Sequence, residues 1–420
     1  MKKAILFWLA LSCAPVALFA AKLYIPMDET GQKEHLKAYG VAYQALTQGV
    51  KVDWLLNYEG GSFCMDQQES LERICKLRGV NYKIISDGQY TGILETIADA
   101  ESNTDMVRLD KPPKIAVYTP GSKQPWDDAV TMVLTYAEIP YDKVYDDDVL
   151  DGKLPMYDWL HLHHEDFTGQ YGKFYAAYSQ AAWYQEDVRK NEAVAYRRGF
   201  KKVSQLKLAV AQKIRDFVLG GGFLFAMCSA TDSYDIALAA TGVDICEKMY
   251  DGDPADPQAQ QKLDYNKCFA FKGFHLEPNP YIYEYSDIDV TTYRRVPFET
   301  DYFSLFTFSA KFDPVPTMLC QNHTTTIKGF MGQTTAFNKN FIKSNVLIMG
   351  DNKGANEARY IHGEYGKGTW TFYGGHDPED YQHAVGDPPT DLSLHPSSPG
   401  YRLILNNVLF PAAKKKPQKT

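Results

Sequence analysis

The segment FLFAMCSA, residues 223–230, places a cysteine where an apolar strand gives way to a helix. The apolar run before the cysteine has strand length, and residues 231–240 have the pattern of a helix. A strand that turns sharply into a helix exposes its turn residue above a sheet and aims backbone N–H groups at a developing oxyanion. The turn needs small neighbours, and Ala226 and Ala230 meet this demand. The sequence therefore predicts a nucleophile elbow at Cys228.

The sequence around this elbow predicts an α/β domain with a parallel sheet over residues 111–413. Strand and helix patterns alternate from residue 115 onward, and residues 204–219 form an amphipathic helix that leads into the elbow strand. Between about 244 and 333 the sequence is rich in Tyr, Phe, Asp and Pro, which predicts a β-rich insertion of loops and short strands. Further elements are expected at 346–349, in a hairpin at 360–373 and in a helix at 401–409.

Residues 22–110 form a smaller α/β unit ahead of this domain. Short extended runs alternate there with helical patterns at 33–47, 68–77 and 90–98. Such alternation predicts a parallel sheet in this unit as well. The punctuation Lys-Pro-Pro-Lys at 111–114 marks the expected domain boundary.

The first residues have the pattern of a secretory signal peptide, assigned to 1–21. Two lysines precede an apolar run that ends in small residues. Export to the periplasm or cell envelope is therefore expected, with no transmembrane segment after cleavage. A lipidated Cys13 is the weaker alternative, because the apolar run continues beyond it. Residues 414–420 form a short basic tail.

Composition restricts the function classes further. The net charge of −8 leaves no basic face for nucleic acid, so no nucleic-acid partner is expected. Six of the seven cysteines lie beyond the signal peptide, without CxxC pairs or metal-ligand spacing. The 29 tyrosines and six tryptophans, with an aromatic run at 174–183, would suit either a sugar- or peptide-binding surface or plain core packing.

A histidine with nearby carboxylates follows the late strand at 369–373. His376 comes directly after two glycines, and Asp377 and Glu379 follow it. Because open α/β sheets gather ligand sites at the carboxyl ends of their strands, His376 and Cys228 are expected at the same edge. Such a pair would have the composition of a Cys–His catalytic site.

The order of strand, cysteine elbow, helix and late histidine resembles the class I glutamine amidotransferase-like superfamily, with features of its ThuA-like members over 365–376. The resemblance implies a flavodoxin-like parallel sheet and a Cys-dependent amide or peptide hydrolase or acyl transferase. His376 would deprotonate Cys228, Asp377 or Glu379 would orient the imidazole, and the Ser229 N–H would bind the oxyanion. The helix after Cys228 would lower the pKa of its thiol.

As a whole, the chain is similar to exported Bacteroidota proteins often labelled asparagine synthetase B. ATP-dependent enzymes of that name begin with a catalytic Cys directly after Met and carry a Ser-Gly-Gly-x-Asp-Ser loop. Here Met1 is followed by Lys2, and the nearest lookalike, at 229–233, lacks both glycines. The sequence therefore argues against an ATP-dependent asparagine synthetase.

A second polar cluster, His-Leu-His-His-Glu-Asp at 161–166, ends another predicted strand. His161, His163 and Glu165 are candidate ligands of a divalent metal, although no cofactor is required by the sequence. Substrate binding is the other expected role of this cluster. The residues expected to bind substrate are His163, His164, Glu165 and Asp166 of this cluster, together with His383 of the long polar loop at 380–399.

Three functions follow from these features. The first is a Cys-dependent hydrolase or acyl transferase that acts on an unknown envelope substrate. The second is a non-catalytic envelope protein that binds an unknown protein partner, with Cys228 buried as a small apolar residue. The third is a metal-dependent hydrolase that uses the His161 cluster.

Overall fold

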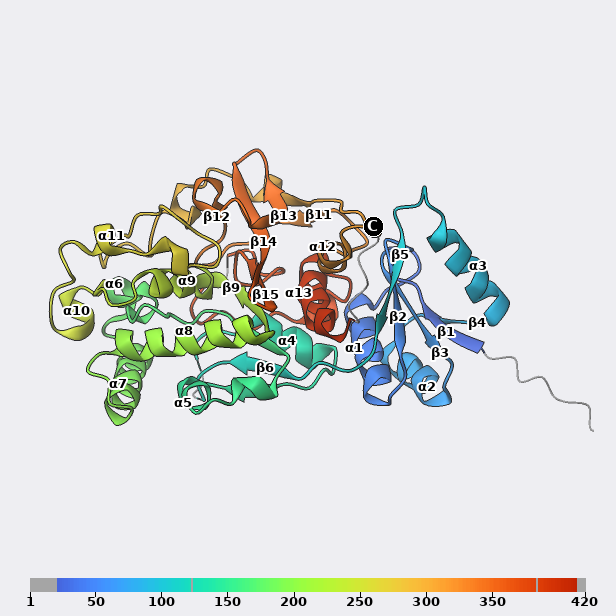
Figure 1. Ribbon diagram of the computed structural model, residues 1–420, viewed down its shortest axis with the longest axis horizontal. Helices are drawn as coiled ribbons and strands as arrows, with labels where there is room; N and C mark the ends of the chain where they lie inside the picture. The colour runs from blue at the N-terminus through green and yellow to red at the C-terminus, as the bar shows by residue number, and fades with distance from the viewer. Residues whose placement is uncertain (1–20, 122–123, 383, 414–420) are drawn as a thin grey trace, which may run out of the picture.

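The computed structural model describes residues 21–121, 124–382 and 384–413, which form two α/β units side by side (Figure 1). The expected signal peptide, except Ala21, lies outside the described residues. The same holds for Cys13, His383 and the basic tail at 414–420. Among the described residues, no helix combines the length and apolar character that crossing a membrane requires.

The first unit has a five-stranded sheet in which all pairs are antiparallel, in the order β4-β1-β3-β2-β5. Its elements are β1 (Ala21–Ile25), α1 (His35–Thr47), β2 (Val52–Leu56), β3 (Ser62–Asp66), α2 (Glu69–Arg78), β4 (Lys83–Ser86), α3 (Asp87–Ala98) and β5 (Asp105–Leu109). The expected parallel sheet is therefore wrong for this unit. The sequence analysis missed β3, which follows β2 through a tight turn with positive φ at Asn57, Glu59, Gly60 and Gly61.

The second unit contains a ten-stranded mixed sheet. Its strands are β6 (Ile115–Tyr118), β7 (Asp142–Val144), β8 (Trp159–Leu162), β9 (Phe223–Met227), β10 (Tyr302–Leu305), β11 (Thr326–Lys328), β12 (Phe337–Asn338), β13 (Leu347–Asn352), β14 (Glu357–Tyr365) and β15 (Gly368–Tyr373). Strands β7-β6-β8-β9-β15 are parallel neighbours, and the rest of the sheet is antiparallel. The expected parallel sheet is thus present as one half of a larger mixed sheet.

Helices cover both faces of the parallel half. The α-helices of the second unit are α4 (Ala129–Tyr136), α5 (Asp146–Leu150), α6 (Tyr175–Tyr178), α7 (Ala182–Arg197), α8 (Val203–Gly220), α9 (Asp232–Ala239), α10 (Lys248–Asp251), α11 (Ala259–Lys262), α12 (Pro314–Leu319) and α13 (Pro399–Leu409). Side chains alternate along β9: Phe225 packs with α4 and α13, while Leu224 packs with α8 on the other face. This alternation explains why β9 is apolar throughout. The expected helices at 204–219, 231–240 and 401–409 are confirmed.

The segment 244–333 is mostly loop and short helix, so the expected β-rich insertion is only partly right. The expected strand near 302–308 is present as β10, whereas 281–285 has no strand. Because β10 pairs with β13, the insertion extends the main sheet instead of forming a separate body. Its last residues also reach the elbow, as described below.

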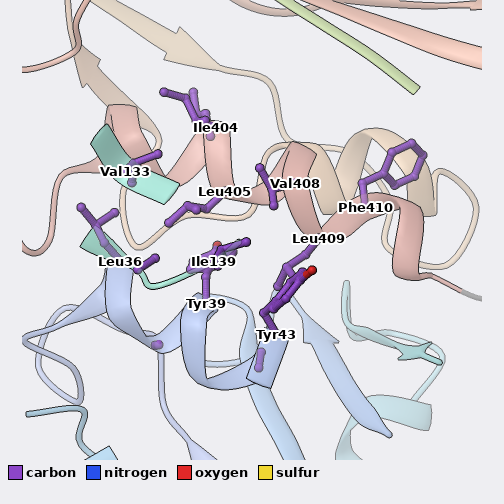
Figure 2. Packing of buried hydrophobic residues seen from close by; sticks show 14 of the residues in the cluster. Leu36, Tyr39, Tyr43, Val133, Ile139, Ile404, Leu405, Val408, Leu409 and Phe410 are labelled. Atoms are coloured by element: carbon purple, nitrogen blue, oxygen red, sulfur yellow. The ribbon is translucent and has the colours of Figure 1, made fainter. Parts of the chain in front are cut away.

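The two units share one apolar core (Figure 2). Tyr39 and Tyr43 of α1 lie against Leu405 and Leu409 of α13, with Ile139 beside them. The chain thus passes from the first sheet to the second after β5 without a break in packing. Helix α13 therefore packs the first unit against the second unit, which carries the predicted elbow.

Candidate functional site

Cys228 occupies the sharp turn that the sequence predicts. It follows β9 directly and starts a short 3-10 helix, Cys228–Ala230, that leads into α9. Its φ of +52° lies in the left-handed region, which costs a non-glycine residue about 1–3 kcal/mol. The Cys228 N–H donates to the carbonyl oxygen of Gly375 at 3.2 Å. Thus β9 and the loop after the adjacent parallel strand β15 hold the turn together.

The thiol of Cys228 is buried and protonated. Burial raises the pKa of the Cys228 thiol to about 12, although the backbone N–H groups of Ser229 and Gln333 donate to the sulfur and favour the thiolate. The cysteine is only 3% exposed. This result is opposite to the sequence-based expectation of a lowered pKa, because desolvation outweighs both N–H groups. The Gln333 contact comes from the end of the insertion, which the sequence analysis did not connect with the elbow.

Alkylation of Cys228 by iodoacetamide is expected to be slow at pH 7 and to rise about tenfold per pH unit up to pH 10. The reason is that a thiol with a pKa of about 12 holds roughly one thiolate in 10⁵ at pH 7. Mass spectrometry of the Cys228 peptide would give the rate, with the urea-unfolded protein as the accessible control. A rate that levels off below pH 8 would contradict the buried, protonated thiol.

His376 follows β15 as expected, but the carboxylate beside its ring comes from elsewhere. His376 Nε2 lies 3.4 Å from Asp127 Oδ1, in the loop that follows β6. Asp377 accepts hydrogen bonds from Thr390 Oγ1 and the Glu379 N–H. Glu379 also lies 3.1 Å from the ring of His395. Asp127 is therefore the carboxylate contact at His376, a residue that sequence reasoning missed.

The rings of His161, His163 and His376 form a chain of contacts with an oxygen atom at each end. His161 Nδ1 is 3.1 Å from the carbonyl oxygen of Phe225, and His376 Nε2 faces Asp127. Between these ends, His161 Nε2 is 3.3 Å from His163 Nδ1, and His163 Nε2 is 3.2 Å from His376 Nδ1. A neutral imidazole carries one N–H, so in a cluster of three neutral rings the two end contacts would use the protons of His161 and His376.

The one remaining proton, on His163, can serve only one of the two ring-to-ring contacts. If Nδ1 carries it, the lone pairs of His163 Nε2 and His376 Nδ1 face each other. If Nε2 carries it, the lone pairs of His163 Nδ1 and His161 Nε2 face each other instead. Asp128 Oδ1 lies 3.5 Å from His163 Nδ1 and 3.6 Å from His161 Nε2. Facing lone pairs repel in a buried site, and a positive charge between them relieves the repulsion. Either a proton added to one of the rings or a bound metal ion would supply this charge.

His164 adds a third imidazole on the same side as His376. Both of its ring nitrogens are buried without a hydrogen-bond partner, and its side chain is 11% exposed. Burial, with the neighbouring histidines, holds the pKa of His164 well below its usual range, so its ring is neutral. Ligand nitrogens of His163, His164 and His376 all lie within 4.8 Å of one another. These three residues have the arrangement needed to hold a metal ion, and Asp128, His161 and His163 form a second such group.

The carboxylates of this cluster have different roles. Glu165 Oε2 accepts the His163 N–H at 3.0 Å, while Glu165 Oε1 has no partner. Burial raises the pKa of Glu165 to about 8. Asp128 caps α4 by accepting the Thr131 N–H, and, against the effect of burial, His161 and His163 hold its pKa well below its usual range. Asp166 accepts N–H bonds from Thr168 and Gly172, so it orders the loop after β8.

All these groups meet at the carboxyl edge of the parallel strands. The Ala230 N–H donates to the His163 carbonyl oxygen at 3.0 Å, which joins the elbow to the histidine cluster. His164 and Glu165 also line a small cavity of about 60 Å³. Cys228, His163, His164, Glu165 and His376 thus lie at the same edge of the sheet, but of these five only His164 and Glu165 line the cavity. Asp127 and Asp128 were missed, although they follow a strand of the same sheet.

No known protein family and no curated protein matches this sequence. Among solved structures, a cytoplasmic protein from Salmonella typhimurium is similar at 12% identity, over 72% of this chain and 100% of its own, with a TM-score of 0.34. A second cytoplasmic protein, from S. typhimurium LT2, has 14% identity over 66% of this chain and 91% of its own, with a TM-score of 0.32. A catalytic mutant of a GH42 β-galactosidase from G. stearothermophilus has 11% identity over 63% and 28%, with a TM-score of 0.26. Scores this low carry no argument about function.

Proposed function

We propose that this protein is a metal-dependent hydrolase whose ion is held by His163, His164 and His376. The observation that carries this proposal is the set of three imidazoles, two buried and one nearly so, with ring nitrogens within 4.8 Å of one another. Three protein nitrogens with one position left for water are typical of catalytic zinc sites.

The reaction that fits this site is hydrolysis of an amide or ester. A divalent ion at such a site polarises a carbonyl oxygen and makes water a better nucleophile. Glu165, whose pKa burial raises to about 8 and whose Oε1 has no hydrogen-bond partner, would accept one proton of the attacking water in its ionised form. The acyl C–N or C–O bond then breaks, and the leaving amine or alcohol takes that proton. The products are a carboxylic acid and the amine or alcohol. With the expected export of the chain, the substrate would be an envelope component.

A second candidate is the Cys-dependent hydrolase or acyl transferase expected from the amidotransferase-like resemblance. The observation that favours it is the strained elbow, with N–H groups of Ser229 and Gln333 at the Cys228 sulfur. The protonated thiol and the pairing of His376 with His163 make it the weaker candidate. In the metal-dependent reaction the elbow would have a structural role.

Metal removal and return distinguish the two candidates. Dialysis against EDTA is expected to abolish hydrolysis of 4-nitrophenyl acetate, and one equivalent of Zn²⁺ is expected to restore it at least about tenfold, because the ion activates the attacking water. Elemental analysis would give the bound zinc, and Cys228→Ala should keep the zinc-dependent rate. If EDTA has no effect and Cys228→Ala removes the activity, the thiol reaction is correct. If neither change matters, the protein is not a hydrolase of either kind.

A further inference from the structure

A small cavity adjoins the proposed metal site. Its volume is about 60 Å³, and His164 and Glu165 belong to its lining. A water molecule needs about 10–15 Å³ of such volume, so the cavity has room for about four groups of that size. It can therefore hold only a small part of a substrate next to the residues that would carry out the reaction.

Aromatic rings limit the size of this cavity. Trp126, Phe174 and Trp183 line it, with ring centroids 5.3, 5.2 and 5.7 Å apart in the three pairs. The Trp126 ring also meets the His164 ring edge-on at 5.1 Å. Because these rings pack against one another and against a proposed ligand, they leave no space for a long side chain of a substrate.

The polar atoms of the lining show what kind of group the cavity suits. Trp126 Nε1, a donor, and the acceptors Glu165 Oε1 and Asn191 Oδ1 are buried without a hydrogen-bond partner among the described residues. Asn191 is 6% exposed, and its Nδ2 donates to the Asp187 carbonyl oxygen at 2.9 Å, which leaves Oδ1 as the unused atom. Buried polar atoms are nearly always satisfied, so these three point to a ligand with both donors and an acceptor.

The charges of the lining favour an amine as the donor. Asp187 also lines the cavity and lies one turn before Asn191 on α7, so the two side chains share one face of this helix. A carboxylate near an amide oxygen favours a positively charged donor. The Lys207 ammonium is part of the lining too, but the Asp146 carboxylate binds it at 2.8 and 3.0 Å and offsets its charge.

We propose that this cavity binds a glycyl group and that the substrate is an amide whose acyl part is an N-terminal glycine. The volume of the cavity matches a glycyl group, whereas a leucyl group is too large for it. The glycyl amine would donate to Asn191 Oδ1, and its carbonyl oxygen would accept from Trp126 Nε1. Glu165 Oε1 would accept from the attacking water. An acetyl group is small enough, but it would leave Asn191 Oδ1 buried without a donor, which is costly.

The cleavage part of this inference rests on the proposed function, whereas glycyl binding does not. Hydrolysis would join the water oxygen to the glycyl carbonyl carbon and break the C–N bond. The proton taken up by Glu165 would go to the leaving amine, so the products are glycine and an amine. Binding needs only the cavity and its unsatisfied atoms, so the EDTA-treated protein tests it separately.

NMR titration of the EDTA-treated full chain with glycinamide, propionamide and leucinamide tests the binding. Propionamide has the shape of glycinamide with a methyl group in place of the amine. Glycinamide is expected to bind at least about tenfold more tightly than either of the others, because propionamide leaves Asn191 Oδ1 unsatisfied and leucinamide is too large.

Three variants show whether the cavity causes this preference. Asn191→Leu should reduce the preference for glycinamide over propionamide at least about fivefold, since it removes the acceptor. Trp183→Ala should reduce the preference over leucinamide by a similar factor, since it enlarges the cavity. Tyr196→Ala is the matched control and should keep both preferences, because Tyr196 is on the same helix and is 86% exposed.

The outcomes separate the glycyl site from the hydrolase. Zinc-dependent release of 4-nitroaniline from glycyl-4-nitroanilide, faster than from the acetyl and leucyl compounds, would support both. Preferred binding of glycinamide without any release after zinc loading would support the glycyl site and count against the hydrolase. No binding of glycinamide, equal binding of glycinamide and propionamide, or unchanged preferences in both cavity variants would overturn the glycyl site, whatever the metal content.

Discussion

His163→Ala, His164→Ala and His376→Ala are each expected to weaken Zn²⁺ binding by at least about 100-fold. Loss of a residue that only supports a ligand costs about 10–100-fold, so loss of a ligand itself should cost no less. Competition with a chromophoric chelator would give the affinities. His275→Ala is the matched control, because its side chain is 70% exposed and lies beside Asp287, in the insertion. Retention of zinc affinity within about threefold in all three variants would remove the basis for the metal site.

The same measurement identifies which of the two groups holds the ion. His163 belongs to both groups, whereas His161 and Asp128 belong only to the second. His164, with two unsatisfied nitrogens, makes the first group the better one. We therefore expect His161→Ala to weaken zinc binding less than His164→Ala does. The reverse order would place the ion between His161, His163 and Asp128.

The sequence predicted those parts of the fold that depend on local pattern. The run into Cys228, the helix that became α8 and the β14–β15 hairpin have strong periodicity or turn signals, and all are present. The predicted parallel pairing of the first sheet was wrong because two strands, β3 and β5, were missed, and both pair with β2. A Gly-Gly pair at 60–61 lies in the turn that makes β2 and β3 a hairpin, and this signal was passed over.

The sequence predicted only those site residues that follow a recognised strand. His163, His376 and Cys228 were placed correctly because each follows a strand of the same parallel half. Asp127 follows β6 by the same rule but was missed, since Asp377 is closer to His376 in sequence. The sequence left open whether Cys228 is exposed or buried, because Gln333, whose N–H contacts the sulfur, lies 105 residues further along the chain.

Arg294→Met is expected to lower the free energy of unfolding by about 3–5 kcal/mol, because it leaves buried carboxylates without their main partner. The Arg294 guanidinium bonds to Asp301 at 2.7 and 3.1 Å and to Glu357 at 2.7 and 2.9 Å. The three side chains are 3%, 1% and 2% exposed. Arg359 remains near both carboxylates, at 3.8 Å from each. Urea unfolding followed by circular dichroism would measure the loss.

Arg295→Met is the matched control, since Arg295 is the next residue and is exposed, and it should change stability by less than about 0.5 kcal/mol. Arg294 also links this ion network to the site, because its NH1 lies 3.3 Å from Met331 Sδ, two residues before Gln333. If the network holds the end of the insertion over the elbow, Arg294→Met should speed alkylation of Cys228 under conditions where the protein is still folded. Equal stability of the two variants would show that Arg359 alone satisfies Asp301 and Glu357. Unchanged alkylation with lower stability would show that other contacts hold Gln333 over the thiol.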